Sequence, residues 1–135
     1  MEIVGLQGLE DRMPDKLSGG MLQRMVLAKT LITKPKLLLL DEPFSALDVF
    51  NRERLQNEFL NILKEFKDTM TIFSTHDIEE AVYLSSQKVI VLTKGPAEIK
   101  KIVDVANLEL GKGKELRRRV LFFEKVNEIR DLFGL

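Results

Sequence analysis

The chain has 135 residues, of which 44% are hydrophobic and 31% are charged, a composition typical of one globular domain. Lysine plus arginine and aspartate plus glutamate number 21 each, so no net charge attracts nucleic acid or an anionic membrane. Cysteine is absent, which excludes disulfides and thiolate metal sites, and no stretch resembles a signal peptide or a membrane span. We therefore expect a cytoplasmic chain without a nucleic-acid partner.

The first predicted element is a helix that follows a short glycine turn, Leu17-Ser18-Gly19-Gly20. Apolar residues then recur at three- and four-residue steps as far as Ile32. We expect Ser18 to cap this helix, and Pro35 to end it by moving Lys34 out of the α region. Amides at such a helix start favour an anion, although for this string alone an ordinary capped turn is the commoner explanation.

A continuous apolar run, residues 37–40, predicts a strand that is buried on both faces of a parallel sheet. It delivers Asp41 and Glu42 to the carboxyl end of the sheet, where ligands bind in open α/β folds. Asp41 would hold Mg²⁺, directly or through water, and Glu42 would orient or deprotonate an attacking water. A solvated strand end is the alternative, and it is the commoner one for an isolated acidic pair.

Two further polar positions follow predicted elements. Asp48 precedes a helix over 51–66, either as its N-cap or as a site residue. His76, the only histidine, follows a β-branched strand over 69–75, so it can lie beside Asp41 and donate to a phosphate, although a lone histidine is more often structural. Asp77 is expected to cap the short helix after it.

The rest of the chain predicts a third strand over 89–92, an edge strand over 99–105 and a helix from about residue 114. Alternating strands and helices predict an α/β fold with a mainly parallel sheet and an antiparallel edge. The last helix has an apolar face at helical spacing, Leu116, Val120, Phe123, Val126, Ile129 and Phe133.

The order and spacing of these motifs closely resemble the ATP-binding cassette (ABC) ATPases. The glycine turn, the strand with its acids, the stretch to Asp48 and Ser74-Thr75-His76-Asp77 resemble that family's signature loop, Walker B strand, D-loop and switch histidine. Nowhere does the sequence contain the phosphate-binding loop G-x-x-x-x-G-K-[ST]. The resemblance covers about residues 4–105, and its details are similar to importer cassettes for nitrate, sulfonate and taurine.

This resemblance implies the C-terminal part of a P-loop, RecA-like ABC ATPase core, truncated so that the first half of the domain is missing. Residues 1–105 would form that part, and residues 106–135 a C-terminal helical extension. Asp41 would support Mg²⁺, while Glu42 and His76 would be catalytic. The residues implied to face ATP held by a partner subunit, or to couple the two sites, are Ser18, Gly19, Gly20, Gln23 and Asp48.

The resemblance also implies an ATP-dependent importer subunit, with ATP and Mg²⁺ as cofactors in the intact cassette. Its partners would be a second cassette in a head-to-tail dimer, membrane permease subunits and, indirectly, a substrate-binding protein. Without the phosphate-binding loop we expect no ATP turnover by this chain alone, and we expect self-association. The alternatives are a non-catalytic module that lends its signature loop to a complete cassette, and an ATPase of chromosome or repair machinery, against which the neutral charge and Asp-Glu-Pro-Phe argue.

Overall fold

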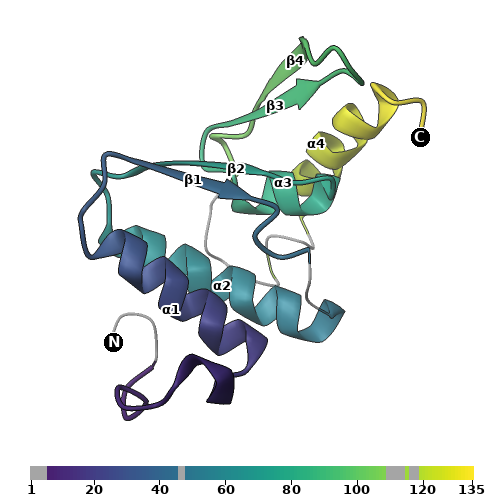
Figure 1. The fold of residues 1–135 in the computed structure, drawn as a ribbon. Coiled ribbons are helices and arrows are strands. Elements are labelled where there is room, and N and C mark those ends of the chain that lie inside the picture. Colours follow the sequence, from purple (N-terminus) through teal and green to yellow (C-terminus); the bar gives the residue numbers. More distant parts are fainter. Residues whose placement is uncertain (1–5, 46–47, 109–114, 116–118) are drawn as a thin grey trace. The chain divides into compact units, whose positions relative to one another are not determined.

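The computed structural model describes residues 6–45, 48–108, 115 and 119–135. Contacts divide the chain into two compact units, residues 1–73 and 74–135, each of which is described by itself. Two-stranded sheets and helices make up both units, which confirms the predicted α/β class (Figure 1). The predicted division at residue 105 stays a prediction.

The first unit opens with a short 3-10 helix, η2 (Pro14–Lys16), and helix α1 (Gly19–Leu31). Ser18 caps α1 as predicted, because its side chain accepts a hydrogen bond from the backbone N–H of Met21. Lys34, which precedes Pro35, has a left-handed backbone with φ 48°, so the predicted exit from the α region is confirmed.

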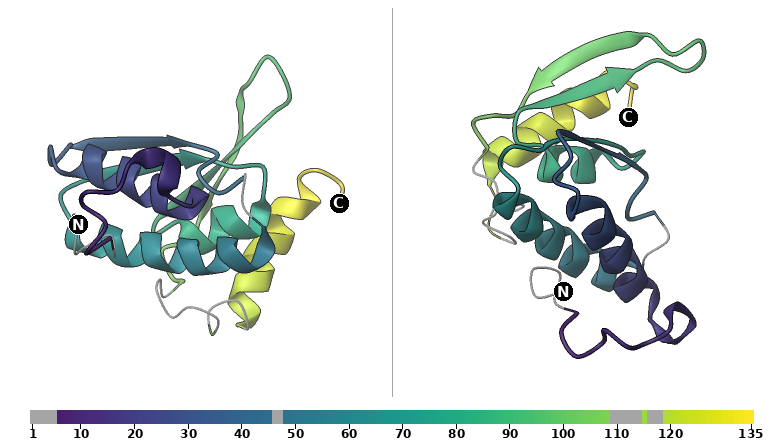
Figure 2. Two further views of the ribbon diagram at one scale, coloured as in Figure 1. Left: turned by 60° about the horizontal axis from the view of Figure 1, so that its bottom comes forward. Right: turned by 60° about the vertical axis from the view of Figure 1, so that its left-hand side comes forward.

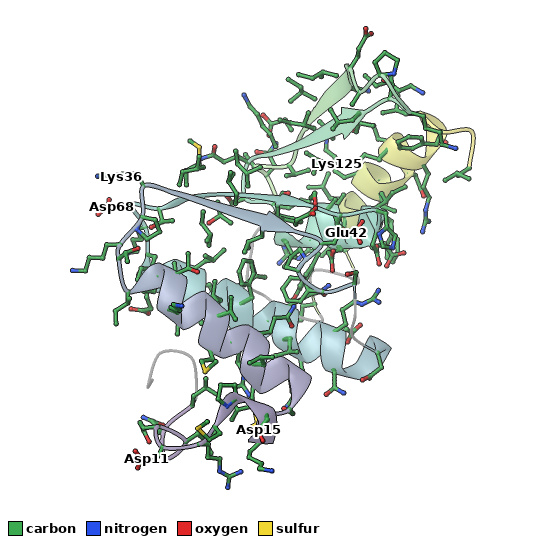
Figure 3. The ribbon with its side chains drawn as sticks, in the orientation of Figure 1. Asp11, Asp15, Lys36, Glu42, Asp68 and Lys125 are labelled. Atoms are coloured by element: carbon green, nitrogen blue, oxygen red, sulfur yellow. The ribbon has the colours of Figure 1, made fainter. Side chains whose placement is uncertain are left out.

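Strand β1 (Leu37–Asp41), helix α2 (Val49–Glu65) and strand β2 (Met70–Ser74) follow, and β1 pairs with β2 in parallel. The backbone N–H of Met70 donates to the carbonyl of Lys36 at 2.9 Å, where both strands start. Figure 3 labels Lys36 and Asp68 at this end of the pair and Glu42 at the other. The sheet therefore carries the two acids to its carboxyl end, as the sequence predicts.

Helices α1 and α2 lie on one side of the β1–β2 pair, and the views of Figure 2 agree on this. Leu38 points toward the core with an exposed fraction of 3%. The ring of Phe59 from α2 packs edge-on against Phe44, with 5.5 Å between the ring centroids. Leucines of the two helices complete this core, Leu27, Leu31, Leu55 and Leu60.

The other face of the β1–β2 pair is open, which corrects the prediction that the strand at 37–40 is buried on both faces. Leu39 is 65% exposed, and Leu37 is also exposed. The physical reason is the period of two in a strand, which sends alternate side chains to opposite faces, only one of which is covered by α1 and α2.

The second unit contains helix α3 (Ile78–Leu84), strands β3 (Lys88–Leu92) and β4 (Ile99–Asp104), and helix α4 (Val120–Asp131). Strands β3 and β4 are antiparallel, with Ile90 opposite Ile102. Within the described residues of this unit β3 and β4 form a two-stranded sheet, and their antiparallel pairing agrees with the antiparallel strand predicted over 99–105. Helix α4 packs against α3.

The apolar face predicted for the last helix is partly wrong. Val126 and Ile129 are buried as expected, but Phe123 and Val120 are exposed and Phe122 is buried in their place. Leu116 and the predicted start of the helix near residue 114 lie outside the described residues. Two adjacent phenylalanines offer two helical registers, and packing rather than spacing selects one.

Within the described residues, no helix is both long enough and apolar enough to cross a membrane.

Candidate functional site

The carboxyl end of β1 presents the two predicted acids. Asp41 is the last residue of the strand and is exposed, and Glu42, the next residue, is half-buried. Glu42 has a left-handed backbone with φ 43°, which a residue with a Cβ adopts at a cost of about 1 kcal/mol. Its carbonyl accepts hydrogen bonds from the backbone N–H of Ser45 at 3.2 Å and from the Ser45 hydroxyl at 3.0 Å. This turn fixes the direction in which the chain leaves the strand.

The start of α1 places Ser18, Gly19 and Gly20 at a helix N-terminus. The Ser18 hydroxyl lies 3.4 Å from the backbone N–H of Met21, so it serves as the cap. A Cβ on Gly20 would lie 3.0 Å from a terminal methyl of Leu55, whereas a Cβ on Gly19 would meet nothing within 4 Å. Packing against Leu55 therefore explains why position 20 is a glycine. Neither packing nor a positive φ requires a glycine at position 19.

Gln23, one turn further along α1, lies at a cavity of about 180 Å³ within the first unit. The cavity is lined by apolar side chains of α1, β1 and α2, together with Arg24 and Asp41. Arg24 forms an ion pair with Glu58 of α2 at 3.4 Å, a contact that the sequence pattern did not indicate. Gln56 of the same helix is buried, and no sequence pattern indicated that either.

Asp48 caps α2, so the N-cap alternative for this residue is confirmed. Its carboxylate accepts a hydrogen bond from the backbone N–H of Asn51 at 3.1 Å and another from the Asn51 side-chain amide at 2.6 Å. A capping carboxylate at an exposed helix start remains accessible, so this structural role does not exclude a second one.

His76 is exposed and lies between β2 and α3, in the second unit. The next residue, Asp77, caps α3 as predicted by accepting a hydrogen bond from the backbone N–H of Glu80 at 3.1 Å. The backbone N–H of Asp77 donates to the hydroxyl of Thr75 at 3.1 Å, so the two residues that flank the histidine are joined by a hydrogen bond. Because His76 and the two acids belong to different units, their meeting stays a prediction.

An α/β unit with acids at the end of a parallel strand, followed in the chain by further strand and helix units, fits a part of the P-loop nucleotide triphosphatase core. A family model described as "ABC transporter" matches residues 1–45. Over 127 residues the chain is 46% identical to an aliphatic sulfonates import ATP-binding protein of Bacillus anthracis, covering 90% of this chain and 49% of that protein. It is 47% identical over 97 residues to a nitrate import ATP-binding protein of Synechococcus elongatus, covering 72% of this chain and 35% of that one.

A solved structure described as an inward-facing conformation of a metal-chelate type ABC transporter is 30% identical in sequence. It superimposes with a TM-score of 0.64 over 79% of this chain and 41% of that chain. The chain therefore belongs to the ATP-binding cassette family. It spans about half the length of the curated relatives it matches.

Proposed function

We propose that the chain is the signature-loop and Walker B part of the ATP-binding subunit of an importer that couples ATP hydrolysis to uptake of a small solute, such as nitrate, a sulfonate or taurine. The names of the relatives from Bacillus anthracis and Synechococcus elongatus support this class of solute. The observation that carries the proposal is the end of β1, where Asp41 is followed by Glu42 and the backbone of Glu42 is left-handed. Such strained backbone is characteristic of functional sites.

In this proposal Glu42 acts on the hydrolytic water and Asp41 supports Mg²⁺. Among the described residues, no group of three or more His, Cys, Asp or Glu could hold a metal ion. The exposed carboxylate of Asp41 nevertheless fits Mg²⁺, because this ion typically takes one or two carboxylates and fills its other positions with water and phosphate oxygens. Bound Mg²⁺ would neutralise charge on the phosphates, and the chain would supply only the carboxylates.

The start of α1 would face ATP held by a second subunit in a head-to-tail dimer. Ser18 and Gly20 would direct the helix N-terminus at the terminal phosphate, and the open surroundings of Gly19 allow the close approach that this requires. Gln23 would flank that contact, Asp48 would couple the two sites, and His76 would contact the phosphate bound to its own subunit.

The remaining partners in this proposal are permease subunits, which would hold the chain at the inner face of the membrane, and a substrate-binding protein that acts through them. ATP is the nucleotide that the relatives' names imply.

The test is turnover of Mg²⁺-ATP by the purified chain, alone and together with a polypeptide that carries a phosphate-binding loop. We expect no turnover by the chain alone, and turnover in the complete assembly that falls at least about a hundredfold in Glu42→Gln. Glu65→Gln, at the exposed end of α2, is the matched control. Turnover by the chain alone that Glu42→Gln abolishes would overturn the expectation of inactivity, and unchanged turnover of the assembly carrying Glu42→Gln would remove Glu42 from the catalytic role.

A second candidate is a non-catalytic module that presents its signature loop to a complete cassette. The uncrowded position of Gly19 favours it, because a partner can reach this helix start without any rearrangement of the chain. Binding of the chain to a full-length cassette only when ATP is present, with no turnover of its own in any assembly, would support this function over the first.

A further inference from the structure

In the second unit, two adjacent lysines attach the last helix, α4, to strand β4. Lys101 lies 3.0 Å from the carboxylate of Glu128 on the helix. The ammonium group of Lys100 donates to the carbonyl of Leu132 at the end of α4, and it lies 5.4 Å from the centre of the Phe133 ring. The register of β4 against β3 shifts at this point, and such a bulge allows two successive side chains to reach the same helix. The C-terminal helix is therefore fixed on β4 at two places.

Helix α4 also contacts the start of α3, against which it packs (Figure 1). The Nη2 atom of Arg130 lies 3.0 Å from Oε1 of Glu79, and the two residues are 51 positions apart in the sequence. Glu79 is the second residue of α3, which begins at Ile78, two positions after His76. The C-terminal helix thus reaches the helical turn that directly follows the histidine.

The two ends of α3 are held in different ways. With seven residues this helix is too short to be stable without tertiary contacts. Its last three residues are buried apolar or aromatic side chains, Val82, Tyr83 and Leu84. At its start the structure has two polar contacts, the cap that Asp77 forms with the backbone N–H of Glu80 and the ion pair between Arg130 and Glu79. The placement of the turn at His76 therefore depends on polar contacts, and α4 supplies one of them.

We propose that Arg130 is a positioning residue for His76, because its ion pair with Glu79 fixes the first turn of α3 on the C-terminal helix. The ion pair is a contact within the second unit and does not depend on what the histidine does. That the fixed turn directs His76 at a phosphate rests on the proposed function. The Arg130 and Glu79 side chains are 40% and 39% exposed, so we expect effects of about two- to fivefold, as for other solvent-screened ion pairs.

The first experiment measures hydrogen exchange of the full chain without nucleotide, by mass spectrometry at one protein concentration. We expect Arg130→Met to speed exchange of the backbone N–H groups of Glu80 and Ala81 about two- to fivefold, because both are bonded to Asp77 at the helix start. Lys101→Met is the matched control, since it removes an ion pair of the same helix with β4 and should leave these two groups unchanged. Unchanged exchange in Arg130→Met, or equally faster exchange in Lys101→Met, overturns the proposal.

A double-mutant cycle tests whether Arg130 acts through Glu79. If it does, Glu79→Gln has the same effect as Arg130→Met, and the double variant exchanges no faster than either single variant. Additive effects of the two substitutions would mean that Arg130 acts through another contact, and would overturn the proposal.

The second experiment measures ATP turnover in the complete assembly, in which another polypeptide supplies the phosphate-binding loop. We expect Arg130→Met to lower kcat about two- to fivefold with little change in KM, because a displaced histidine weakens a contact made in the transition state. Lys101→Met should change neither. A raised KM with unchanged kcat would place Arg130 in ATP binding and overturn the proposal.

His76→Ala separates failure of this proposal from failure of the proposed function. If turnover falls in His76→Ala and not in Arg130→Met, the positioning role is overturned while the histidine keeps its own. If turnover is unchanged in His76→Ala, the proposed role of His76 is wrong, and the positioning role is overturned with it. In that case the exchange rates still establish whether the ion pair holds the start of α3.

Discussion

At the scale of single residues, the two glycines at the start of α1 have different surroundings, so different physical causes account for them. Gly20 faces Leu55, whose terminal methyl group would lie 3.0 Å from an added Cβ. Gly19 has open space around it and no positive φ, so alanine would fit there and would be favoured by the conformational entropy of the unfolded chain. A glycine kept where alanine is more stable points to a ligand or partner that approaches the backbone closely.

We predict that Gly19→Ala raises the free energy of unfolding by about 0.5 kcal/mol. Gly20→Ala should be less stable than Gly19→Ala by about 1 kcal/mol, because the buried Leu55 side chain must shift slightly to admit the new methyl group. Urea unfolding followed by circular dichroism, at one protein concentration, measures both. Equal stability of the two variants would contradict the packing reason for Gly20.

The backbone at Glu42 gives a second prediction at this scale. Since φ is 43°, glycine is the residue that adopts this conformation without a steric penalty. Glu42→Gly should therefore be more stable than Glu42→Ala by about 1 kcal/mol in urea unfolding, with both variants lacking the carboxylate. Such a result would mean that a residue with a Cβ at position 42 lowers the free energy of unfolding, as expected where a side chain is needed for chemistry. If Glu42→Ala is the more stable variant, the strain is absent.

At the scale of elements, the N-terminal caps of α1, α2 and α3 were well indicated by the sequence, with Asp48 left open between a cap and a site residue. Ser18, Asp48 and Asp77 each cap the helix that follows, because a short side chain with an oxygen acceptor satisfies the first N–H groups within a few residues of sequence. Capping is a local interaction, and a local pattern predicts it.

Burial was predicted less well, because it depends on what packs against an element. The apolar run at residues 37–40 indicates burial on both faces, and Leu39 is nevertheless exposed. The same limit explains the candidate site. The sequence places Asp41 and Glu42 at a strand end, but the left-handed φ of Glu42 and the limited space that Leu55 leaves at Gly20 arise from tertiary structure.

Strand β4 and helix α4 are joined by an ion pair that allows a test of their packing. Lys101 lies 3.0 Å from the carboxylate of Glu128, and Lys125 lies 3.1 Å from it. These hydrogen bonds, first the one from Lys101 and then the one from Lys125, lower the pKa of Glu128 below its ordinary value. A lowered pKa in the folded state means that the pair stabilises the unit above the pKa of the unfolded chain, and that this contribution disappears as the pH falls through the folded pKa.

We therefore predict that Lys101→Met raises the pKa of Glu128 toward its ordinary value, as measured by NMR titration of the side chain. The effect on stability should be small, because both side chains are partly exposed to solvent and screened by salt. Lys88→Met on β3 is the control and should leave the titration of Glu128 unchanged. An unchanged pKa in Lys101→Met would mean that β4 and α4 do not hold this contact in solution.

At the scale of the whole molecule, the decisive property is that a chain of half a cassette's length exposes apolar side chains on a parallel sheet. We predict that the purified chain self-associates, because Leu39, Met70 and their neighbours on the open face gain free energy by leaving water. Light scattering should show a mean mass that rises with protein concentration, well above the 15.5 kDa of one chain. The double variant Leu39→Lys/Met70→Lys should bring it down, whereas Ile32→Lys should not. A monodisperse, folded monomer of the unmodified chain would show that the sheet tolerates water on this face, and would contradict the prediction of self-association.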